Sequence, residues 1–561
     1  MVHRSTHHPL PPPQPRRGII SKADGETRGS KVEMESSLKS LRASVKTARS
    51  GANEELTAKA GARGDHHAAS QAARQSLLKQ VISFPVLVGA LLVVALFVAL
   101  RNFTVDPDLW WHLKVGQSIL ASRHWPTADP YSFTAQGAPW MAYEWLGDTL
   151  LAAAQRAWGL RGLLALDLGV AAAVVLALYV LASLRSRNSK AAFVTCAMLL
   201  PLVAVSLSLR PQMFGYLYLT LTLIILERFR QGRAGPLWLL PPLFLLWVNT
   251  HGSFVIGLFV CGIYLVSGFF EFRRGDLESA RWTPGERLRL GLVFLASLIV
   301  LTITPYGAKV AAYPMDMAFS QPVNVANVQE WQSMPFNTVA GKVFLAFLVG
   351  FLLVQLARRL TWRLAELALF LAGVAAACMH MRFLMLFVPF AAPLFAVILS
   401  LWVEPYAPGK DKYLLNAFLI IAIVLGIIRF FPSETQLASR VAEHWPVKAV
   451  RYLEQHPPPR PMYNQYVYGG YLIYALDGRN KVFIDGRADI YERLGVFSDY
   501  LSIAQLAPNA LALLEAYHVE SCLIQHDEAL ATLLRASPQW QQVYSDEMSV
   551  LFVRESEKGQ P

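Results

Sequence analysis

The fold is decided by residues 81–112, which read VISFPVLVGALLVVALFVALRNFTVDPDLWWH. Its first part, residues 81–100, carries no charged side chain and is long enough to cross the roughly 30 Å hydrocarbon core of a bilayer as one helix. The chain then turns polar and aromatic, and residues 106–112 hold two aspartates, two tryptophans and a histidine. These features predict a membrane span that is followed by a polar segment at the membrane surface.

Apolar blocks of similar length recur along the chain. Of its 561 residues, 54% are hydrophobic and only 16% are charged, against roughly 25% charged residues in an average soluble domain. This balance excludes an ordinary soluble enzyme and predicts a mainly α fold, a polytopic transmembrane helical bundle. We expect eleven spans, at about residues 81–100, 162–184, 191–209, 212–227, 236–249, 253–272, 289–304, 341–357, 364–380, 383–402 and 413–431.

The basic residues indicate how the chain is oriented. The net charge is +12, and Lys and Arg concentrate in the first 80 residues and in every second connection between spans. The long connections at about residues 101–161 and 305–340 are poor in Lys and Arg for their length. By the positive-inside rule, the N-terminus is cytoplasmic, whereas these loops and the C-terminus lie on the outer side of the membrane. Basic residues spread in this way do not form a nucleic-acid patch.

Composition predicts three parts. Residues 1–80 contain many Pro, Ser, Lys and Arg and few large apolar side chains, so we expect a disordered basic cytoplasmic tail. Residues 81–431 are the transmembrane domain. Residues 432–561 have the polarity of a soluble protein and are expected to form a small α/β domain on the outer side of the membrane. Its predicted strands are Lys481–Ile484, Ser521–Gln525 and Ser549–Arg554, and its predicted helices are Ala507–Tyr517 and Glu528–Ala536.

The first outer loop opens with two aspartates, Asp106 and Asp108, on either side of a proline. Pro107 favours an extended conformation for the residue before it, and residues two apart in an extended chain point to the same side. Two carboxylates facing one volume could bind a divalent cation, or one could act as a general base while the other positions it. Equally, both could cap a helix that begins near Leu109. The sequence leaves the two interpretations open.

Further along the same loop are aromatic and acidic residues. Trp110 and Trp111 are typical of the lipid headgroup level, and stacking on a sugar is the alternative. Asp129 precedes a proline and is expected in a turn. Glu144, next to the following span, is a second candidate for acid/base or metal chemistry.

Polar clusters interrupt the apolar blocks at the predicted outer side. Arg210, His251 and Arg382 lie in three such clusters, where the loops are otherwise poor in basic residues. Arginine can bind phosphate oxygens with two parallel hydrogen bonds. The alternative for each arginine is that it reaches to the membrane surface from a helix end. Because three such groups lie on the same predicted side, the sequence favours phosphate binding.

Two other polar pairs have a structural interpretation beside a functional one. Glu330-Trp331 lies in the outer loop at 305–340 and could contribute to packing alone. Asp485 and Arg487 come after a predicted strand, where they could border a site, although a buried ion pair is the simpler explanation.

The first span, the Asp-Pro-Asp-Leu-Trp-Trp-His loop, the many later spans and the outer α/β segment together resemble the GT-C glycosyltransferase superfamily. More narrowly, the chain is similar to bacterial membrane proteins near the dolichyl-phosphate-mannose mannosyltransferase and lipopolysaccharide core glycosyltransferase families. The resemblance covers the architecture of about residues 81–431 and motifs only within residues 105–146. It implies a sugar donor on polyprenyl phosphate, and Asp106 and Asp108 as catalytic base or metal ligands. The Trp-Trp-Asp-Tyr-Gly signature of oligosaccharyltransferases is absent, which disfavours protein N-glycosylation.

We therefore expect a membrane glycosyltransferase that transfers a sugar from a polyprenyl-phosphate donor to a glycolipid, glycan or protein acceptor on the outer face of the inner membrane. Asp106 and Asp108 are the expected catalytic residues, and they would also hold Mg²⁺ or Mn²⁺ if the reaction uses one. The donor's tail requires an apolar groove between spans. The alternatives are a non-enzymatic carrier or flippase for lipid-linked sugars, or a scaffold. The expected substrate-binding residues are His112, Glu144, Arg210, His251 and Arg382.

Overall fold

A computed structural model describes residues 39–41, 43–47, 77–103, 105–233, 235–358 and 360–555. The chain forms two units, residues 1–81 and residues 82–561. The described residues of the first unit are short helical pieces, and the rest of the predicted disordered tail lies outside the described residues. The second unit contains all the predicted spans, except for residue 81 at the start of the first one, and all the candidate site residues.

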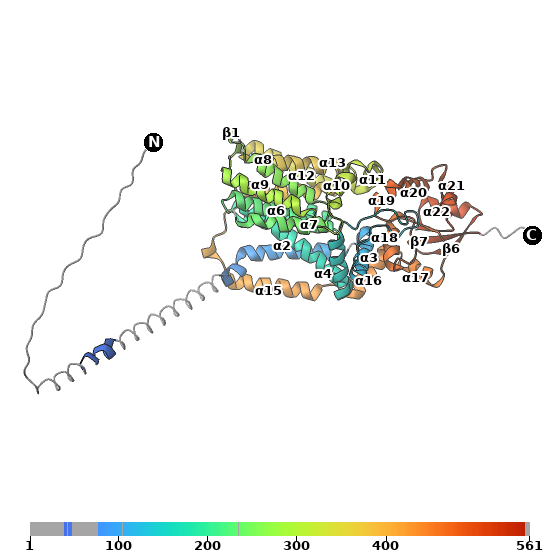
Figure 1. The fold of residues 1–561 in the computed structure, drawn as a ribbon, viewed down its shortest axis with the longest axis horizontal. Helices are drawn as coiled ribbons and strands as arrows, with labels where there is room; N and C mark the ends of the chain where they lie inside the picture. The colour runs from blue at the N-terminus through green and yellow to red at the C-terminus, as the bar shows by residue number, and fades with distance from the viewer. Residues whose placement is uncertain are drawn as a thin grey trace, which may run out of the picture. The chain divides into compact units, whose positions relative to one another are not determined.

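The second unit is mainly helical, and the long helices of its bundle run side by side (Figure 1). Each of the eleven predicted spans falls on one of these helices. They are α2 (Phe84–Leu100), α4 (Trp145–Ser186), α5 (Ser189–Ser206), α6 (Gln212–Arg230), α7 (Leu240–Thr250), α8 (Phe254–Ser267), α9 (Pro284–Val300), α12 (Val339–Arg358), α13 (Leu364–Met379), α14 (Leu384–Leu399) and α15 (Tyr413–Phe430).

Five helices of the described part of the chain are long and apolar enough to cross a membrane. They are Leu77–Leu100, Trp145–Ser186, Val339–Arg358, Met381–Leu399 and Tyr413–Phe430. Three shorter apolar helices lie among them, at Ser189–Ala204, Phe254–Ser267 and Leu364–Met379. The chain is thus a multi-pass membrane protein, and the count of eleven spans stays a prediction.

Much of the predicted outer loop at 101–161 is helical, because α3 (Pro107–Ser122) and the first part of α4 lie within it. Helix α4 is kinked where Gly159 takes a positive φ of 61°, which glycine adopts without strain. Past the kink, the backbone N–H groups of Leu160 and Arg161 donate to the carboxylate of Glu434, at 2.9 and 3.1 Å. The kink therefore ends the apolar span and ties it to the C-terminal segment.

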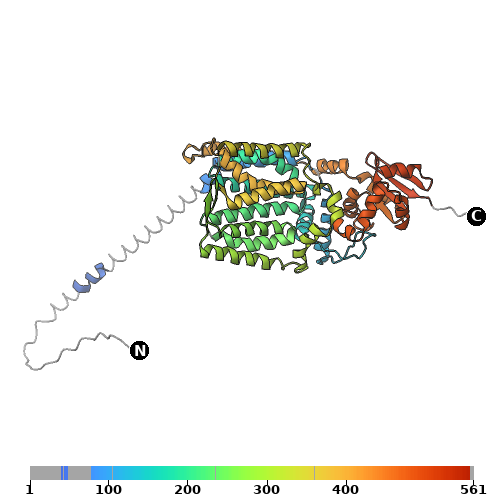
Figure 2. The same cartoon turned by 90° about the horizontal axis from the view of Figure 1, so that it is seen from above.

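The C-terminal segment, residues 432–555, gathers at one end of the bundle, next to α3 (Figures 1 and 2). We call this the α3 end. The strands of its sheet follow the order β4-β5-β7-β6, with β4 parallel to β5 and the other pairs antiparallel. Its elements are α16 (Glu434–His444), α17 (Val447–Gln455), β4 (Met462–Asn464), α18 (Tyr466–Ala475), α19 (Ala488–Arg493), α20 (Val496–Ala504), α21 (Ala510–Ala516), β5 (Ser521–Gln525), α22 (Ala529–Ala536), β6 (Trp540–Ser545) and β7 (Ser549–Arg554).

The strand predicted at Lys481–Ile484 is wrong. This stretch forms one isolated bridge, in which Val482 pairs with Ser132 of the first loop. The Asn464 side chain forms hydrogen bonds with the backbone of the next two residues. The N–H of Phe483 donates to Asn464 Oδ1 at 2.8 Å, and Asn464 Nδ2 donates to the carbonyl oxygen of Ile484 at 2.8 Å. A side chain thus replaces the neighbouring strand.

Four short elements complete the α3 end. They come from the predicted loop at 305–340 and from the turn before α14. They are α10 (Lys309–Phe319), α11 (Pro322–Asn327), η2 (Gln329–Trp331) and η3 (Met381–Phe383). The three-stranded sheet of β1 (Phe272–Arg274), β2 (Leu277–Ser279) and β3 (Trp362–Arg363) lies at the opposite end of the bundle (Figure 1).

Helix α3 is wedged between α4 and α18. A Cβ at Gly116 would lie 2.0 Å from the carbonyl oxygen of Asp148 in α4, and one at Gly470 would lie 2.8 Å from that of Pro107. Trp110 is buried, with its ring centroid 5.0 Å from that of Tyr471. The prediction that Trp110 lies at the lipid headgroups is therefore wrong, because the C-terminal segment covers this face of α3.

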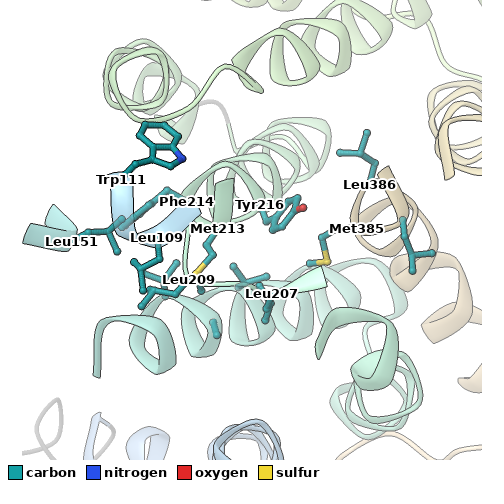
Figure 3. Close-up of a cluster of buried hydrophobic side chains, with 14 of the residues drawn as sticks. Leu109, Trp111, Leu151, Leu207, Leu209, Met213, Phe214, Tyr216, Met385 and Leu386 are labelled. Carbon is teal, nitrogen blue, oxygen red and sulfur yellow. The ribbon is translucent and has the colours of Figure 1, made fainter. Parts of the chain in front are cut away.

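An apolar core lies beside the first turns of α3. Leu109 of α3, Met213 of α6 and Met385 of α14 are buried in one apolar cluster there (Figure 3). The start of α3 and the ends of two bundle helices thus border the same core. Polar residues at those ends are thereby brought close together.

Candidate active site

A cavity of about 740 Å³, including the part open to solvent, lies at the α3 end between bundle and C-terminal segment. Its walls come from α3, the ends of α4, α6 and α7, the short elements η2 and η3, and α19. Six of the seven residues singled out from the sequence line it, namely Asp108, His112, Glu144, Arg210, His251 and Arg382. The seventh, Asp106, contacts one of them. The cavity is therefore the candidate active site.

Asp106 and Asp108 meet at the start of α3. The helix begins at Pro107, and Asp106 caps it by accepting the backbone N–H of Asp108 on Oδ1 at 2.9 Å. Asp106 is extended, as predicted, but the prediction that Asp108 continues the extended stretch is wrong, because proline is favoured at the first helical position and brings Asp108 into the first turn. Both carboxylates nevertheless converge on Arg210: Asp106 Oδ2 lies 3.1 Å from its Nε, and Asp108 Oδ2 lies 3.0 Å from its Nη1.

Asp108 is the carboxyl that faces the cavity. Its Oδ1 accepts the indole N–H of Trp111 at 3.2 Å, so this tryptophan holds the acid rather than lying at the lipid headgroups. Burial, together with the charge of Asp106 and against the opposing effect of Arg210, raises the pKa of Asp108 to about 7. A carboxyl that ionises near neutral pH has the pKa expected of a general base.

Arg210 and Arg382 turn into the cavity, so membrane-surface contact is the wrong interpretation for both. One carboxylate joins them: Glu330 Oε2 lies 3.1 Å from Arg210 Nη2, and Glu330 Oε1 lies 3.2 Å from Arg382 Nη1. The Arg382 guanidinium also lies 4.1 Å from the ring centroid of Trp331. Burial raises the pKa of Glu330, but the charges of Arg382 and Arg210 lower it by more. The net shift of this pKa is therefore downward, and Glu330 is ionised.

Two histidines and two acids form a chain along the cavity wall. His112 Nδ1 lies 2.6 Å from Asp148 Oδ1, and its Nε2 lies 3.6 Å from Glu144 Oε2. His251 Nε2 lies 3.3 Å from Glu144 Oε1, while its Nδ1 accepts the backbone N–H of Ser253 at 3.1 Å. The neutral His251 ring therefore carries its proton on Nε2, and this N–H group donates a hydrogen bond to Glu144.

Burial dominates the ionisation of this chain. It raises the pKa of Glu144 to about 8 and lowers that of His251 to about 3, and it places the pKa of His112 well below its usual range. At neutral pH the two imidazoles are thus uncharged and Glu144 is protonated. These groups can donate and accept hydrogen bonds in the cavity without adding charge to it.

The C-terminal segment closes the remaining wall through Arg487. Its Nη1 lies 2.6 Å from Asp129 Oδ1 in the first loop, and its Nη2 lies 2.6 Å from Asp485 Oδ2. The guanidinium lies 4.8 Å from the ring centroid of Trp140. This confirms the buried ion pair expected for Asp485 and Arg487. Asp489, two residues on, lines the cavity, and burial raises its pKa to about 6.

The two aspartates do not fit a divalent cation in this arrangement, because the guanidinium of Arg210 fills the position between them. Within the described ranges, no three His, Cys, Asp or Glu side chains are grouped as metal ligands.

Sequence reasoning missed several of these groups. For Glu330 the sequence left a structural and a functional interpretation open, and nothing near it in the chain points to Arg210. Asp148 could have been found, because it lies four residues after Glu144, one turn along a helix. Asp489 carries no comparable local signal.

Two apolar cavities meet the expectation of a groove between spans. One of about 870 Å³ lies between α2 and α15. A smaller one of about 370 Å³ lies between α6, α8 and α14, and is lined by Tyr216, Leu219, Ile256 and Leu386. The smaller cavity shares Gln212, His251 and Arg382 with the candidate active site. It therefore leads from the polar site into the apolar bundle.

No protein-family model matches the chain, and no curated protein matches it in sequence. Similar solved structures include the apo oligosaccharyltransferase of Archaeoglobus fulgidus, with 14% identity, a TM-score of 0.47 and coverage of 78% of this chain and 69% of that one. Another is ArnT from Cupriavidus metallidurans bound to undecaprenyl phosphate, with 16% identity, a TM-score of 0.47 and coverage of 85% and 99%. Both are membrane glycosyltransferases of the GT-C superfamily, the group that the sequence resembles.

Proposed function

We propose that the protein is a glycosyltransferase that transfers a sugar from a polyprenyl-phosphate donor to an acceptor hydroxyl at the α3 end. The supporting observation is that one cavity, next to an apolar bundle, holds the Asp108 carboxyl together with the guanidinium groups of Arg210 and Arg382. Acid and base chemistry and phosphate binding are the two requirements of this reaction. The charge pattern of the sequence supports an outward-facing α3 end, which would be the periplasmic face of an inner membrane.

Asp108 acts as the general base. It takes the proton of the acceptor hydroxyl as that oxygen bonds to the anomeric carbon of the sugar, and the bond from that carbon to the phosphate oxygen breaks. Arg210 and Arg382 offset the charge that develops on the leaving phosphate. Asp106 is a positioning residue, because it caps α3 and holds Arg210 without lining the cavity.

Three further wall residues, Glu144, His251 and His112, bind and orient the substrates. Protonated Glu144, with His251 and His112 beside it, supplies uncharged hydrogen-bonding groups for the sugar or the phosphate. The cavity between α6, α8 and α14 takes the first isoprene units, because it is apolar and adjoins Arg382. A glycolipid, glycan or protein acceptor enters from the side of the C-terminal segment. No step is assigned to a divalent cation.

The test uses the full chain in lipid nanodiscs with a panel of polyprenyl-phosphate sugars, and follows the release of free polyprenyl phosphate. We expect turnover with at least one donor, and a higher KM for that donor in Arg382→Gln. Arg358→Gln is the matched control, because Arg358 also lies over a tryptophan, Trp402, but outside the cavity. Binding of the lipids without release in the wild type would refute the enzyme and favour a carrier.

A further inference from the structure

We propose that the Glu330 carboxylate occupies the position of the donor's phosphate between Arg210 and Arg382, and that a phosphate binds only by displacing it. The inference rests on the proposed function, since it concerns the same phosphate site. It assigns to Glu330 the role of a built-in competitor, which sets the affinity of the site for anionic substrate and product.

The geometry is that of an anion held by two guanidinium groups. Each Glu330 oxygen contacts a different arginine, at 3.1 Å to Arg210 and 3.2 Å to Arg382. Phosphate oxygens accept from guanidinium N–H groups with the same charge-assisted chemistry. A phosphate between these two arginines would therefore need the volume and the N–H donors that Glu330 now uses.

The charges around the arginines lead to the same conclusion. Arg210 contacts Asp106 and Asp108 as well as Glu330, so three carboxyl groups surround one guanidinium. With Glu330 in place, an added phosphate would meet like charges at close range, which disfavours its binding. Removing Glu330 from between the arginines frees one N–H face on each.

Glu330 can leave without unfolding its surroundings. It lies on the short turn η2, whose backbone is fixed to η3 by two contacts. His380 Nδ1 lies 2.5 Å from the carbonyl oxygen of Trp331, and the N–H of Met381 donates to the carbonyl oxygen of Gln332 at 2.9 Å. The Glu330 side chain itself is 27% exposed. Rotation of this side chain toward solvent therefore opens the site while η2 stays in place.

The test measures the binding of undecaprenyl phosphate to the full chain in nanodiscs at pH 7.5. We expect Glu330→Gln to bind this lipid about tenfold more tightly than the wild type. This factor follows if Glu330 occupies the site in about nine-tenths of the wild-type molecules, which leaves about one-tenth able to bind. A gain in affinity is the informative sign, because loss of a structural contact would weaken binding. Inorganic phosphate serves as a second probe. If Glu330→Gln bound undecaprenyl phosphate more tightly but not inorganic phosphate, the ligand that competes with Glu330 would be the headgroup of a membrane lipid.

Two controls separate displacement from a general change of charge. Asp489→Asn removes an acid from the wall of the same cavity, and Asp489 is not among the carboxylates that pair with Arg210 or Arg382 in the described chain. Glu366→Gln removes a carboxylate that also lies among arginines, with Arg185 at 2.6 Å, Arg363 at 3.1 Å and Arg230 at 3.8 Å, but outside this cavity. We expect a small gain at most in the first and no change in the second.

The outcomes distinguish the inference from the proposed function. Affinity that depends on Arg382 but is equal or weaker in Glu330→Gln, or that rises as much in Asp489→Asn, would overturn the role of Glu330 alone. No phosphate binding in the wild type or any variant would overturn the proposed function and this inference with it. Glu330→Ala, checked for folding by thermal unfolding, repeats the test if the glutamine variant is unstable.

Discussion

Replacement of Gly486 by alanine should damage the site without unfolding the protein. Gly486 lies between Asp485 and Arg487, and a Cβ there would stand 1.9 Å from Asp108 Oδ1 and 3.0 Å from Trp111 Nε1. Ordinary contact begins at 3.4 Å, so the carboxylate must move by about 1.5 Å. Because Asp108 is held by Trp111 and Arg210, this movement breaks at least one of its two hydrogen bonds.

The expected loss follows from the size of that displacement. A shift of about 1 Å in a reacting group can cost about 100-fold, so kcat/KM in Gly486→Ala should fall by at least that factor, or about 2.7 kcal/mol. The assay is the release of polyprenyl phosphate in nanodiscs, with thermal unfolding measured in parallel.

The matched control is Gly409→Ala, because a Cβ at Gly409 meets nothing within 4 Å. It should keep wild-type kcat/KM. A folded Gly486→Ala protein with wild-type kcat/KM would refute the reasoning, since it would mean that the position of Asp108 does not matter.

Three further predictions follow from the same site. Because Asp108 must be ionised to accept a proton and its pKa is raised to about 7, kcat/KM should fall about tenfold per pH unit below about pH 7, and a flat profile from pH 5 to 8 would contradict this. Arg487→Gln leaves Asp129 and Asp485 as buried charges, so thermal or denaturant unfolding should show a loss of about 3–5 kcal/mol at pH 7. Burial of Asp129 raises its pKa, but Arg487 lowers it by more, so this pKa lies below 3.8. The pair therefore stabilises the fold above pH 3.8, and the difference in unfolding free energy between wild type and variant should shrink as the pH falls below that value. Arg210→Ala releases the two carboxylates of Asp106 and Asp108, so Mn²⁺ should bind this variant more tightly than wild type by calorimetry, and equal affinity would contradict the account of how Arg210 holds them.

The sequence predicted the parts of the molecule that follow from local chemistry. Apolar blocks located the bundle helices, although only five helices of the described chain are long and apolar enough to cross a membrane. Arg210, His251 and Arg382 were found because polar groups within apolar blocks avoid lipid and turn inward. Their meeting in one cavity depends on how the ends of distant helices pack, which local patterns do not predict.

What the sequence could not predict depends on contacts between distant residues. Asp129 and Arg487 are 358 positions apart, and their ion pair exists because α18 and the following turn pack on α3. The same packing buries Trp110, which local pattern had assigned to the membrane surface. Glu330 reached its place between two arginines through the fold of the loop before α12, for which the sequence has no periodic signal.

The most direct test of the central claim compares two aspartates that are two residues apart. Single-turnover transfer from a bound polyprenyl-phosphate sugar should fall by about 10² to 10⁴ in Asp108→Asn, since a general base contributes that much, with donor affinity little changed. Asp106→Asn should lose much less, because Asp106 acts through the helix cap and Arg210. If Asp108→Asn kept the wild-type rate, or if Asp106→Asn lost more than Asp108→Asn, Asp108 would not be the base and the account of this site would be wrong.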